Sequence, residues 1–308
     1  MKIVIPEKIS ARGIREFEEA GFQVVQLTPA SGASGELARE LNDADALVVR
    51  SAVKVTEELM AAAPRLKVIG RAGVGVDNVD VPAAIARKIV VMNTPGGSSV
   101  AVAELVLAMM LALARQLPRA DSTTRAGQWE KKTLEGAELF GKTLGLLGCG
   151  RIAVEVAKRA RAFDMRVIGC DPISKPELEM VALDQLLAQS DYLSIHVSLT
   201  PESRGLLNAA AFAKMKRGVR LINCARGEVI EEEALVHALH SGHVAGAALD
   251  VFRKEPPGVI ELFQIPNVIA TPHIGASTHE AQERVGHAIA VQIRDFLTAG
   301  TIANAVNA

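Results

Sequence analysis

LGLLGCGRIA, at residues 144–153, is the stretch of sequence that decides the fold. An apolar run enters the pattern G-x-G-x-x-A, and residues of helical period follow it as far as Ala162. Gly148 permits a tight turn, Gly150 lets backbone N–H groups approach a pyrophosphate, and Ala153 is small enough for the helix to pack closely on the strand. The stretch therefore predicts a strand, a turn and a helix that together bind a dinucleotide.

An acidic residue at the end of the next apolar run indicates which dinucleotide is bound. Asp171 follows the run at 166–170, about 20 residues after the glycines, where a carboxylate can accept both ribose hydroxyls. An acid at this position also repels a 2′-phosphate, so the sequence favours NAD over NADP, although Arg151 and Lys175 are nearby cations. The alternative is a purely structural turn followed by a solvated Asp171.

Short apolar, β-branched runs alternate with segments of helical period on both sides of this stretch. This alternation is typical of parallel sheets that are covered on both faces. We therefore predict an α/β fold with two doubly wound parallel sheets. The expected strands of the first sheet are 2–5, 22–27, 46–49, 66–69 and 89–92. Those of the second are 143–147, 166–170, 192–196, 220–224, 244–249 and 268–271.

Two expected helices connect the sheets and divide the chain into domains. A turn-rich segment, 93–97, precedes a long apolar helix at 101–117. Ser277 and Glu280 have the capping-box spacing and open a helix that runs to about Ala299. We expect a discontinuous flavodoxin-like domain that binds substrate, residues 1–96 plus 286–308, and a continuous dinucleotide-binding Rossmann domain, residues 97–285. The first helix is apolar almost all round, so we expect a dimer interface to cover it; the alternative is that the chain buries it internally.

The composition excludes several classes of protein. Of the 308 residues, 49% are apolar and 22% are charged, and no apolar run approaches the roughly 18 residues of a membrane span. Lys and Arg total 34 against 35 for Asp and Glu, which leaves no net positive charge to hold a nucleic acid. We expect no membrane or nucleic-acid partner. The start, MKIVIPEKIS, lacks a signal-peptide pattern, so we expect a cytoplasmic protein.

Cysteine and histidine predict neither a disulfide framework nor a metal site. Cys149, Cys170 and Cys224 form no C-x-x-C pair. All three lie at expected strand ends around the dinucleotide site, and we expect Cys149 to react with thiol reagents when no cofactor covers it. Three histidines within 237–243 have helical spacing but no adjacent cysteine or acidic ligand, so we predict no metal there.

Three polar residues follow the last three strands of the second sheet. In the usual strand order of this fold, Arg226, Glu255 and His273 face the nicotinamide. The oxidation of a 2-hydroxy acid needs a cation for the carboxylate, a base for the hydroxyl proton, and a carboxylate that stabilises the protonated base. These three side chains match the three tasks. In the first domain, Arg50 and Arg71 each end a strand, where they are either surface cations or ligands of a substrate phosphate.

These residues stand in a series of motifs that resembles the D-isomer-specific 2-hydroxyacid dehydrogenases over nearly the whole chain. The motifs are VRSAVKVT at 49–56, GRAGVGVDNVD at 70–80, NTPGG at 93–97, AELVLAMMLALAR at 103–115, GKTLGLLGCGRIA at 141–153, NCARGE at 223–228, GAALDVF at 246–252 and PHIGAST at 272–278. Such a series is far more specific than any single motif.

The resemblance implies a role for each matching position. Arg226 would bind and polarise the substrate, Glu255 would be the partner carboxylate, and His273 the general acid and base. The implied substrate ligands are Arg50, Ser51, Arg71, Gly73, Arg226 and His273. The implied NAD ligands are Val74, Gly148, Gly150, Arg151, Ile152, Asp171, Val197, Cys224, Ala225, Asp250, Ile274, Gly275 and Ala276.

The resemblance also implies an activity. We expect NAD-dependent oxidation of 3-phosphoglycerate to 3-phosphohydroxypyruvate, the first step of L-serine biosynthesis, by a homodimer or homotetramer. The alternatives are an enzyme for glyoxylate, hydroxypyruvate or D-lactate, and a non-catalytic, corepressor-like protein that senses NAD. The chain stops at NAVNA, without the regulatory domains of longer family members, so we expect no feedback by serine through such a domain.

Overall fold

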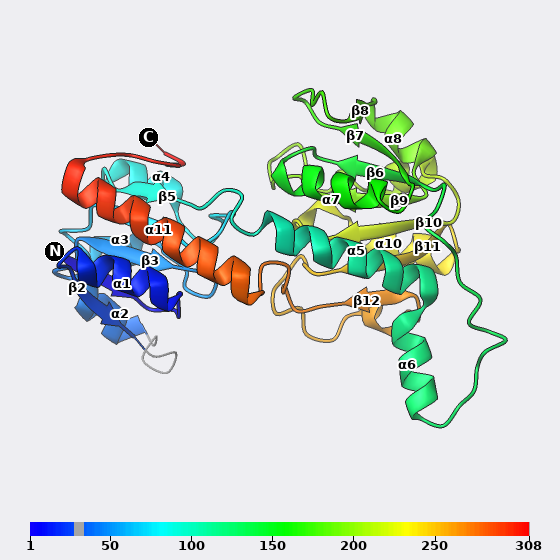
Figure 1. The fold of residues 1–308 in the computed structure, drawn as a ribbon, viewed down its shortest axis with the longest axis horizontal. Coiled ribbons are helices and arrows are strands. Elements are labelled where there is room, and N and C mark those ends of the chain that lie inside the picture. Colours follow the sequence, from blue (N-terminus) through cyan, green and yellow to red (C-terminus); the bar gives the residue numbers. More distant parts are fainter. Residues whose placement is uncertain (28–33, 308) are drawn as a thin grey trace. The chain divides into compact units, whose positions relative to one another are not determined.

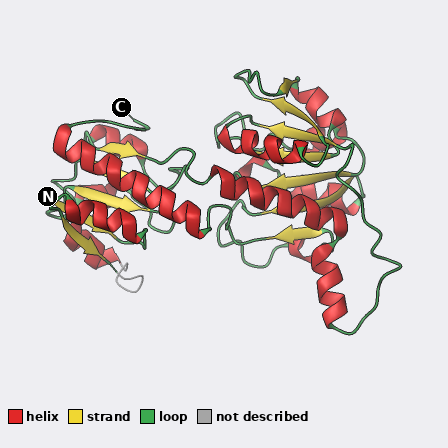
Figure 2. Ribbon diagram, in the orientation of Figure 1, coloured by secondary structure: helices red, strands yellow, loops and turns green. Residues whose placement is uncertain are grey.

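The computed structural model describes residues 1–27 and 34–307. The chain forms two compact units, Met1–Ser98 with Ala276–Ala308, and Ser99–Gly275. Each unit is a parallel sheet with helices on both faces, so the predicted α/β class is confirmed (Figures 1 and 2). The sequence predicted that the first domain ends at residue 96 and resumes at residue 286. In the structure the second of these two boundaries differs most from the prediction. The chain returns to the first unit about ten residues earlier because its last helix begins at His279 and packs along the first helix.

The first unit contains a five-stranded sheet in the order β2-β1-β3-β4-β5. Its strands are β1 (Lys2–Ile5), β2 (Gln23–Gln26), β3 (Ala46–Val49), β4 (Val68–Arg71) and β5 (Val90–Met92). Helices α1 (Ala11–Glu19) and α11 (His279–Ala299) cover one face. Helices α2 (Ser34–Leu41), α3 (Glu57–Ala61) and α4 (Val81–Ala86) cover the other. Side chains alternate between these two cores along each strand, as the period of a strand requires.

The cap of α11 differs from the prediction. Thr278, not Ser277, is the N-cap residue, and its hydroxyl accepts a hydrogen bond from the N–H of Ala281 at 3.1 Å. The Ser277–Glu280 spacing is therefore not a capping box here. Helix boundaries depend on which residue leaves helical geometry first, and the sequence places two hydroxyl residues next to each other at this point.

The second unit contains a seven-stranded sheet in the order β12-β11-β10-β9-β6-β7-β8, counted over its described residues. The strands are β6 (Thr143–Leu147), β7 (Arg166–Cys170), β8 (Glu179–Met180), β9 (Tyr192–Ile195), β10 (Val219–Asn223), β11 (Val244–Leu249) and β12 (Val268–Ala270). The six predicted strands are present. The seventh, β8, is a two-residue edge strand, too short to leave a periodic pattern.

Helices cover both faces of this second sheet (Figure 2). Helices α5 (Ser99–Arg115) and α7 (Arg151–Arg161) pack on one face. Helices α8 (Leu183–Gln189), α9 (Ala209–Lys214) and α10 (Glu232–His240) pack on the other. Short 3-10 helices, η1 (Gly227–Val229) and η2 (Glu261–Gln264), lie in the loops after β10 and before β12.

The long apolar helix is covered within its own unit to a larger extent than expected. Ten residues of α5 are buried, against α7 and the strands β10 and β11. The predicted helix breaks at Gln116, whose backbone is left-handed at φ 51°, and α6 (Leu117–Arg125) continues at 63° to α5. Among the described residues, no single helix has the length and hydropathy of a membrane span; α5 and α6 reach them only when counted together across this bend.

Candidate functional site

The turn between β6 and α7 has the form of a dinucleotide-binding turn. Gly148 has φ 87°, and a Cβ there would lie 2.8 Å from the backbone of His196 and Val197, so the turn packs directly on the end of β9. Gly150 is the N-cap of α7, and apart from its two chain neighbours no described residue has an atom within 4 Å of the place where its Cβ would be. A ligand can therefore approach the N-terminal end of α7 at this glycine, where the N–H groups of a first helical turn can bind a pyrophosphate.

Asp171 lies beside this turn, directly after β7. One carboxylate oxygen accepts the N–H of Cys149 at 2.7 Å, and the other accepts the N–H of Ile173 at 2.8 Å. Because β6 and β7 are neighbours in the sheet, the carboxylate after β7 reaches the glycine turn after β6. An ionised carboxylate has about four acceptor positions, so it can also accept ribose hydroxyls. The residues present fit NAD: a glycine turn for the pyrophosphate and an acid for the ribose.

The three cysteines at this site have thiols of raised pKa. Cys149 is fully buried, and burial together with the charge of Asp171 raises the pKa of its thiol to about 12. Burial likewise raises the pKa of Cys170 and of Cys224. Because the thiolate is the nucleophile, a buried thiol of raised pKa reacts poorly. The burial of Cys149 contradicts the expectation that this thiol is accessible when no cofactor covers it, and its reaction with thiol reagents stays a prediction.

The turn that carries Arg226 is held by a buried amide. Asn223, the last residue of β10, accepts the N–H of Ala225 at 3.0 Å and donates to the carbonyl of Arg226 at 2.9 Å. The next residue, Gly227, has no room for a side chain, because a Cβ would lie 2.0 Å from the carbonyl carbon of Phe252. The Arg226 turn and the loop after β11 therefore meet backbone to backbone.

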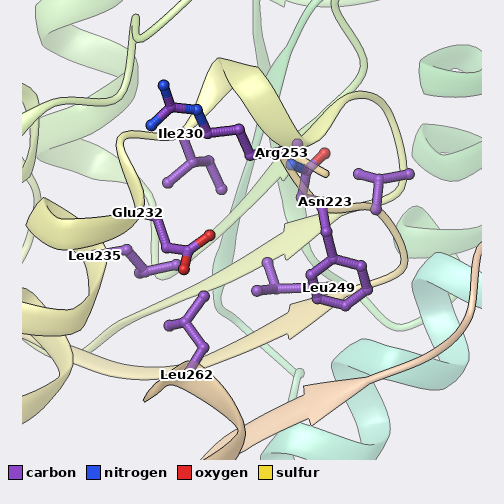
Figure 3. Close-up of a pocket in the computed structure, with 10 residues that line it drawn as sticks. Asn223, Ile230, Glu232, Leu235, Leu249, Arg253 and Leu262 are labelled. Atoms are coloured by element: carbon purple, nitrogen blue, oxygen red, sulfur yellow. The ribbon is translucent and has the colours of Figure 1, made fainter. Parts of the chain in front are cut away.

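Figure 3 shows a small cavity beside this turn, lined by the loops after β10 and β11 and by α10. Its volume is about 20 Å³, which is room for about one water molecule. The carboxylate of Glu232 and the amide of Asn223 are among the groups that line it. The cavity is too small for a cofactor or a substrate, so it is a packing feature behind the Arg226 turn.

His273 and Glu255 form a hydrogen-bonded pair. Nδ1 of His273 lies 2.7 Å from Oε2 of Glu255, and Oε1 accepts the N–H of Phe252 at 3.1 Å. The hydrogen bond to Glu255 raises the pKa of His273. Burial raises the pKa of Glu255, but the hydrogen bonds from His273 and Phe252 and the charge of Arg226 outweigh it, so the net shift is downward. The pair is thus an ionised acid that orients a histidine, with Nε2 left to exchange a proton.

A buried carboxylate holds the loop that carries His273. Asp250 accepts the hydroxyl of Thr271 at 2.5 Å and the N–H groups of Ile274 and Gly275, both at 2.8 Å. His273 itself has a left-handed backbone, φ 55°, between these anchored residues. The expected contact of Asp250 with the cofactor stays a prediction, since the described hydrogen bonds of its carboxylate all serve this loop.

A larger pocket opens beside His273 and Glu255. Its volume is about 510 Å³, and it is lined mainly by Phe, Pro and Ala side chains of the second unit. Phe252 and Phe263 meet edge to face on its wall, with ring centroids 5.4 Å apart. Pockets of this size hold small ligands. The acid–base pair therefore faces a space that a small molecule can enter.

The predicted substrate residues of the first unit gather at one edge of its sheet. Arg50 follows β3 and Arg71 ends β4, and these strands are neighbours in register, with Val49 paired to Arg71. Thr94 donates its N–H and its hydroxyl to the carbonyl of Gly73, at 2.8 and 3.1 Å. Val74 is 38% exposed. The structure thus brings Arg50, Ser51, Arg71, Gly73 and Val74 together within this unit.

Three polar side chains hold loops at the carboxyl edges of the two sheets, and the sequence analysis gave them no role: Glu7, Asn78 and Asn223. Glu7 and Asn223 lie at carboxyl ends of strands, the same signal that identified Asp171. Asn78 lies in the loop before α4 and has no such signal.

Three histidines outside the site, His196, His240 and His243, lie beside local partners. His243 makes a hydrogen bond with the carbonyl of Met215 at 3.0 Å, and His240 lies 3.5 Å from Glu261. Nε2 of His196 lies 2.9 Å from the hydroxyl of Ser194, and burial lowers the pKa of His196 to about 4. Over the described residues, no group of three His, Cys, Asp or Glu side chains is close enough to hold a metal.

Residues 107–275 match the family model described as D-isomer specific 2-hydroxyacid dehydrogenase, NAD binding domain. The chain is 46% identical, over its whole length, to D-3-phosphoglycerate dehydrogenase of Rattus norvegicus, and it spans 58% of that protein. It is similar to the crystal structure of the TT0316 protein from Thermus thermophilus, with a TM-score of 0.91 and 37% identity, covering 99% of this chain and 100% of that one. The NAD+-bound 3-phosphoglycerate dehydrogenase of Entamoeba histolytica has a TM-score of 0.86 and 32% identity, covering 100% and 99%.

Proposed function

This chain belongs to the D-isomer-specific 2-hydroxyacid dehydrogenases, and we propose that it oxidises 3-phosphoglycerate to 3-phosphohydroxypyruvate with NAD. The observation that carries the proposal is the pairing of His273 with an ionised Glu255 at the carboxyl edge of the sheet that holds the dinucleotide turn. The names of the relatives support the substrate. This chain spans little more than half of the length of the curated relative, so its substrate is part of the proposal.

The side chains of the second unit divide the reaction among them. The guanidinium of Arg226 binds the substrate carboxylate through two parallel hydrogen bonds. Nε2 of His273 takes the proton of the C2 hydroxyl in oxidation and returns it in reduction. Glu255 holds the ring by Nδ1 and stabilises its protonated form. NAD, when bound, supplies the acceptor for the hydride that leaves C2.

The cofactor ligands follow from the turn geometry and the family. Gly148, Gly150, Arg151 and Ile152 would hold the pyrophosphate, and Asp171 the ribose. The other proposed ligands are those that the resemblance implies: Val74, Val197, Cys224, Ala225, Asp250, Ile274, Gly275 and Ala276. In the first unit, Arg50, Ser51, Arg71 and Gly73 are the proposed ligands of the substrate phosphate, since a group with nearly two negative charges needs cations.

A parallel assay of NADH consumption tests this function. The substrates are 3-phosphohydroxypyruvate, hydroxypyruvate, glyoxylate, 2-oxoglutarate and pyruvate. We expect the highest kcat/KM with 3-phosphohydroxypyruvate. A preference for an unphosphorylated acid would assign one of the alternative dehydrogenase activities instead. NADH binding without turnover of any acid would point to a non-catalytic sensor.

We further propose a homodimer or homotetramer. Every residue of α6 is partly or fully exposed, and α6 with the segment after it extends away from the sheet of its own unit (Figure 1). The segment carries Trp129 and Phe140, which are 82% and 67% exposed. Aromatic side chains are enriched in contacts between subunits, so this exposed segment is the surface we propose for association. Light scattering should give at least twice the chain mass of 32.6 kDa, and Trp129→Ser should lower it.

We also propose a cytoplasmic location, which the free state of all three cysteines supports. Fractionation of the source cells with an antibody to this chain tests it. Recovery outside the cytoplasmic fraction would contradict the proposal.

A further inference from the structure

A carboxylate of the first unit gathers the backbone of the loop that carries Arg50. Glu7 lies two residues beyond the end of β1, and β1 is paired to β3. Its Oε2 accepts the N–H of Arg50 at 2.8 Å and of Val53 at 3.3 Å, and its Oε1 accepts the N–H of Ala52 at 3.0 Å. Three N–H groups of one short loop therefore converge on a single side chain.

An amide holds the same loop through its carbonyl groups. Nδ2 of Asn78 donates to the carbonyl of Arg50 at 2.9 Å and to that of Val53 at 2.7 Å. The backbone of Asn78 is itself tied to the far end of the loop, because its carbonyl accepts the N–H of Val55 at 2.7 Å. Glu7 and Asn78 thus hold both kinds of backbone group in residues 50–53, which we name the Arg50 loop.

The Arg50 loop has no regular secondary structure of its own to order it. Convergent N–H groups form a concavity that binds anions, and here the chain supplies the anion from Glu7. Hydrogen bonds to an ionised acceptor are shorter and about twice as strong as neutral ones. Within the described residues, the N–H of Ser51 alone among residues 50–53 donates to no partner, so it remains available to a ligand.

We propose that Glu7 is a positioning residue for the substrate phosphate, because it holds the Arg50 loop in the shape that presents the guanidinium of Arg50 and the N–H of Ser51. Asn78 assists from the carbonyl side of the loop. The inference rests on the proposed function and deepens it, since it names residues that do not themselves touch the phosphate.

The two possible effects of Glu7 on phosphate binding, positioning of the loop and repulsion by its charge, predict opposite results when a neutral residue replaces it. The negative charge of Glu7 lies near the proposed phosphate site and repels a phosphate dianion. If charge alone mattered, Glu7→Gln would bind the phosphorylated substrate more tightly. If positioning matters, Glu7→Gln binds it more weakly, because the amide oxygen can keep two of the three N–H bonds while its NH2 group faces the third donor.

The test uses steady-state kinetics of the full chain with 3-phosphohydroxypyruvate. We expect KM to rise about three- to tenfold in Glu7→Gln, which loses one of the three hydrogen bonds to the loop. We expect it to rise more than about tenfold in Glu7→Ala, which loses all three. We expect kcat to stay within about twofold and the Kd of NADH to stay unchanged, since the nucleotide turn lies in the other unit. Glu19→Gln, an exposed acid of α1, is the matched control and should change nothing.

Three results would overturn the inference: an unchanged or lowered KM in Glu7→Gln, an equal rise with hydroxypyruvate, or a fall in kcat alone. If Glu7→Ala fails to fold, Asn78→Ser keeps the carboxylate, removes the amide donors, and should raise the same KM. Hydrogen exchange of the Arg50 loop should accelerate in each variant that raises KM. If the wild-type chain reduces 3-phosphohydroxypyruvate but the variants do not raise KM, only the role of Glu7 is rejected. A wild-type chain that reduces no phosphorylated acid rejects the proposed function, and the inference with it.

Discussion

The carboxyl edges of the two sheets present their functional loops in different ways. In the second unit, the Arg226 and His273 loops are held by Asn223 and Asp250, each only 1% exposed. In the first unit, the Arg50 loop is held by Glu7 and Asn78, which are partly exposed. In both units the loops lie at the carboxyl edge because they follow parallel strands. The side chains that hold the loops are buried in the second unit and partly exposed in the first.

This difference separates chemistry from recognition. A hydrogen bond to a buried group is costly to break because its partner is left unsatisfied, whereas a partly exposed group can turn to water. We therefore expect the second edge to be the more rigid one, which suits the acid–base role proposed for His273. The first edge can adjust to its ligand. Changes at the second edge should lower kcat, and changes at the first should raise KM.

The largest effect is expected for His273→Ala. Turnover should fall about 100-fold or more, the usual contribution of a general acid or base, while the Kd of NADH stays nearly unchanged. Steady-state kinetics and NADH titration measure the two quantities. His240→Ala, which removes an exposed histidine that also lies near a glutamate, is the control. Near-normal turnover would remove His273 from the mechanism.

Arg50→Ala should produce the next largest effect, and at the first edge. With 3-phosphohydroxypyruvate as the substrate, loss of a charged contact should raise KM about tenfold to a hundredfold. Hydroxypyruvate, which lacks the phosphate, should be affected far less, and kcat should change little. If both substrates weaken equally, the comparison between the two edges breaks, because Arg50 then serves the fold instead of the phosphate.

Gly227→Ala tests how closely the loops of the second edge depend on each other. The new Cβ would lie 2.0 Å from the carbonyl carbon of Phe252, so the Arg226 turn must move away from the loop that carries Glu255. We expect a loss of about 1–3 kcal/mol in stability and a fall in kcat. Thermal unfolding and kinetics measure both. Gly35→Ala is the control, because a Cβ there meets no described atom; a similar loss in that variant would contradict the argument.

The smallest effect is a shift in pH dependence. In the proposed mechanism, reduction needs protonated His273, so we expect its rate to fall as pH rises through the raised pKa of that histidine. Glu255→Gln removes the charge that raises this pKa, and the alkaline limb of the reduction profile should move to lower pH. The same sign holds for stability: the pair stabilises the folded chain below the unfolded pKa of histidine, and this contribution is lost above the folded one. Glu261→Gln, beside His240, should leave the profile in place.

Much of the site was predictable because it follows local patterns. The run from Leu144 to Ala153 specifies its own strand, turn and helix, since the glycines and the apolar period act over a few residues. Asp171, Glu255 and His273 were predictable from a single rule, that polar residues after parallel strands meet at one edge. The α/β class and the NAD-binding domain followed from the same patterns and are confirmed.

Other features were decided only by the tertiary structure. Glu7 meets the Arg50 loop across 43 positions of sequence, and Asp250 meets Ile274 across 24. The burial of Cys149, the left-handed break at Gln116 and the lack of room at Gly227 likewise depend on what packs against each residue. Periodicity and turn chemistry describe the chain over one or two turns of structure. The partner of a polar side chain, and hence its pKa and its role, is set by which distant strand ends the fold brings beside it.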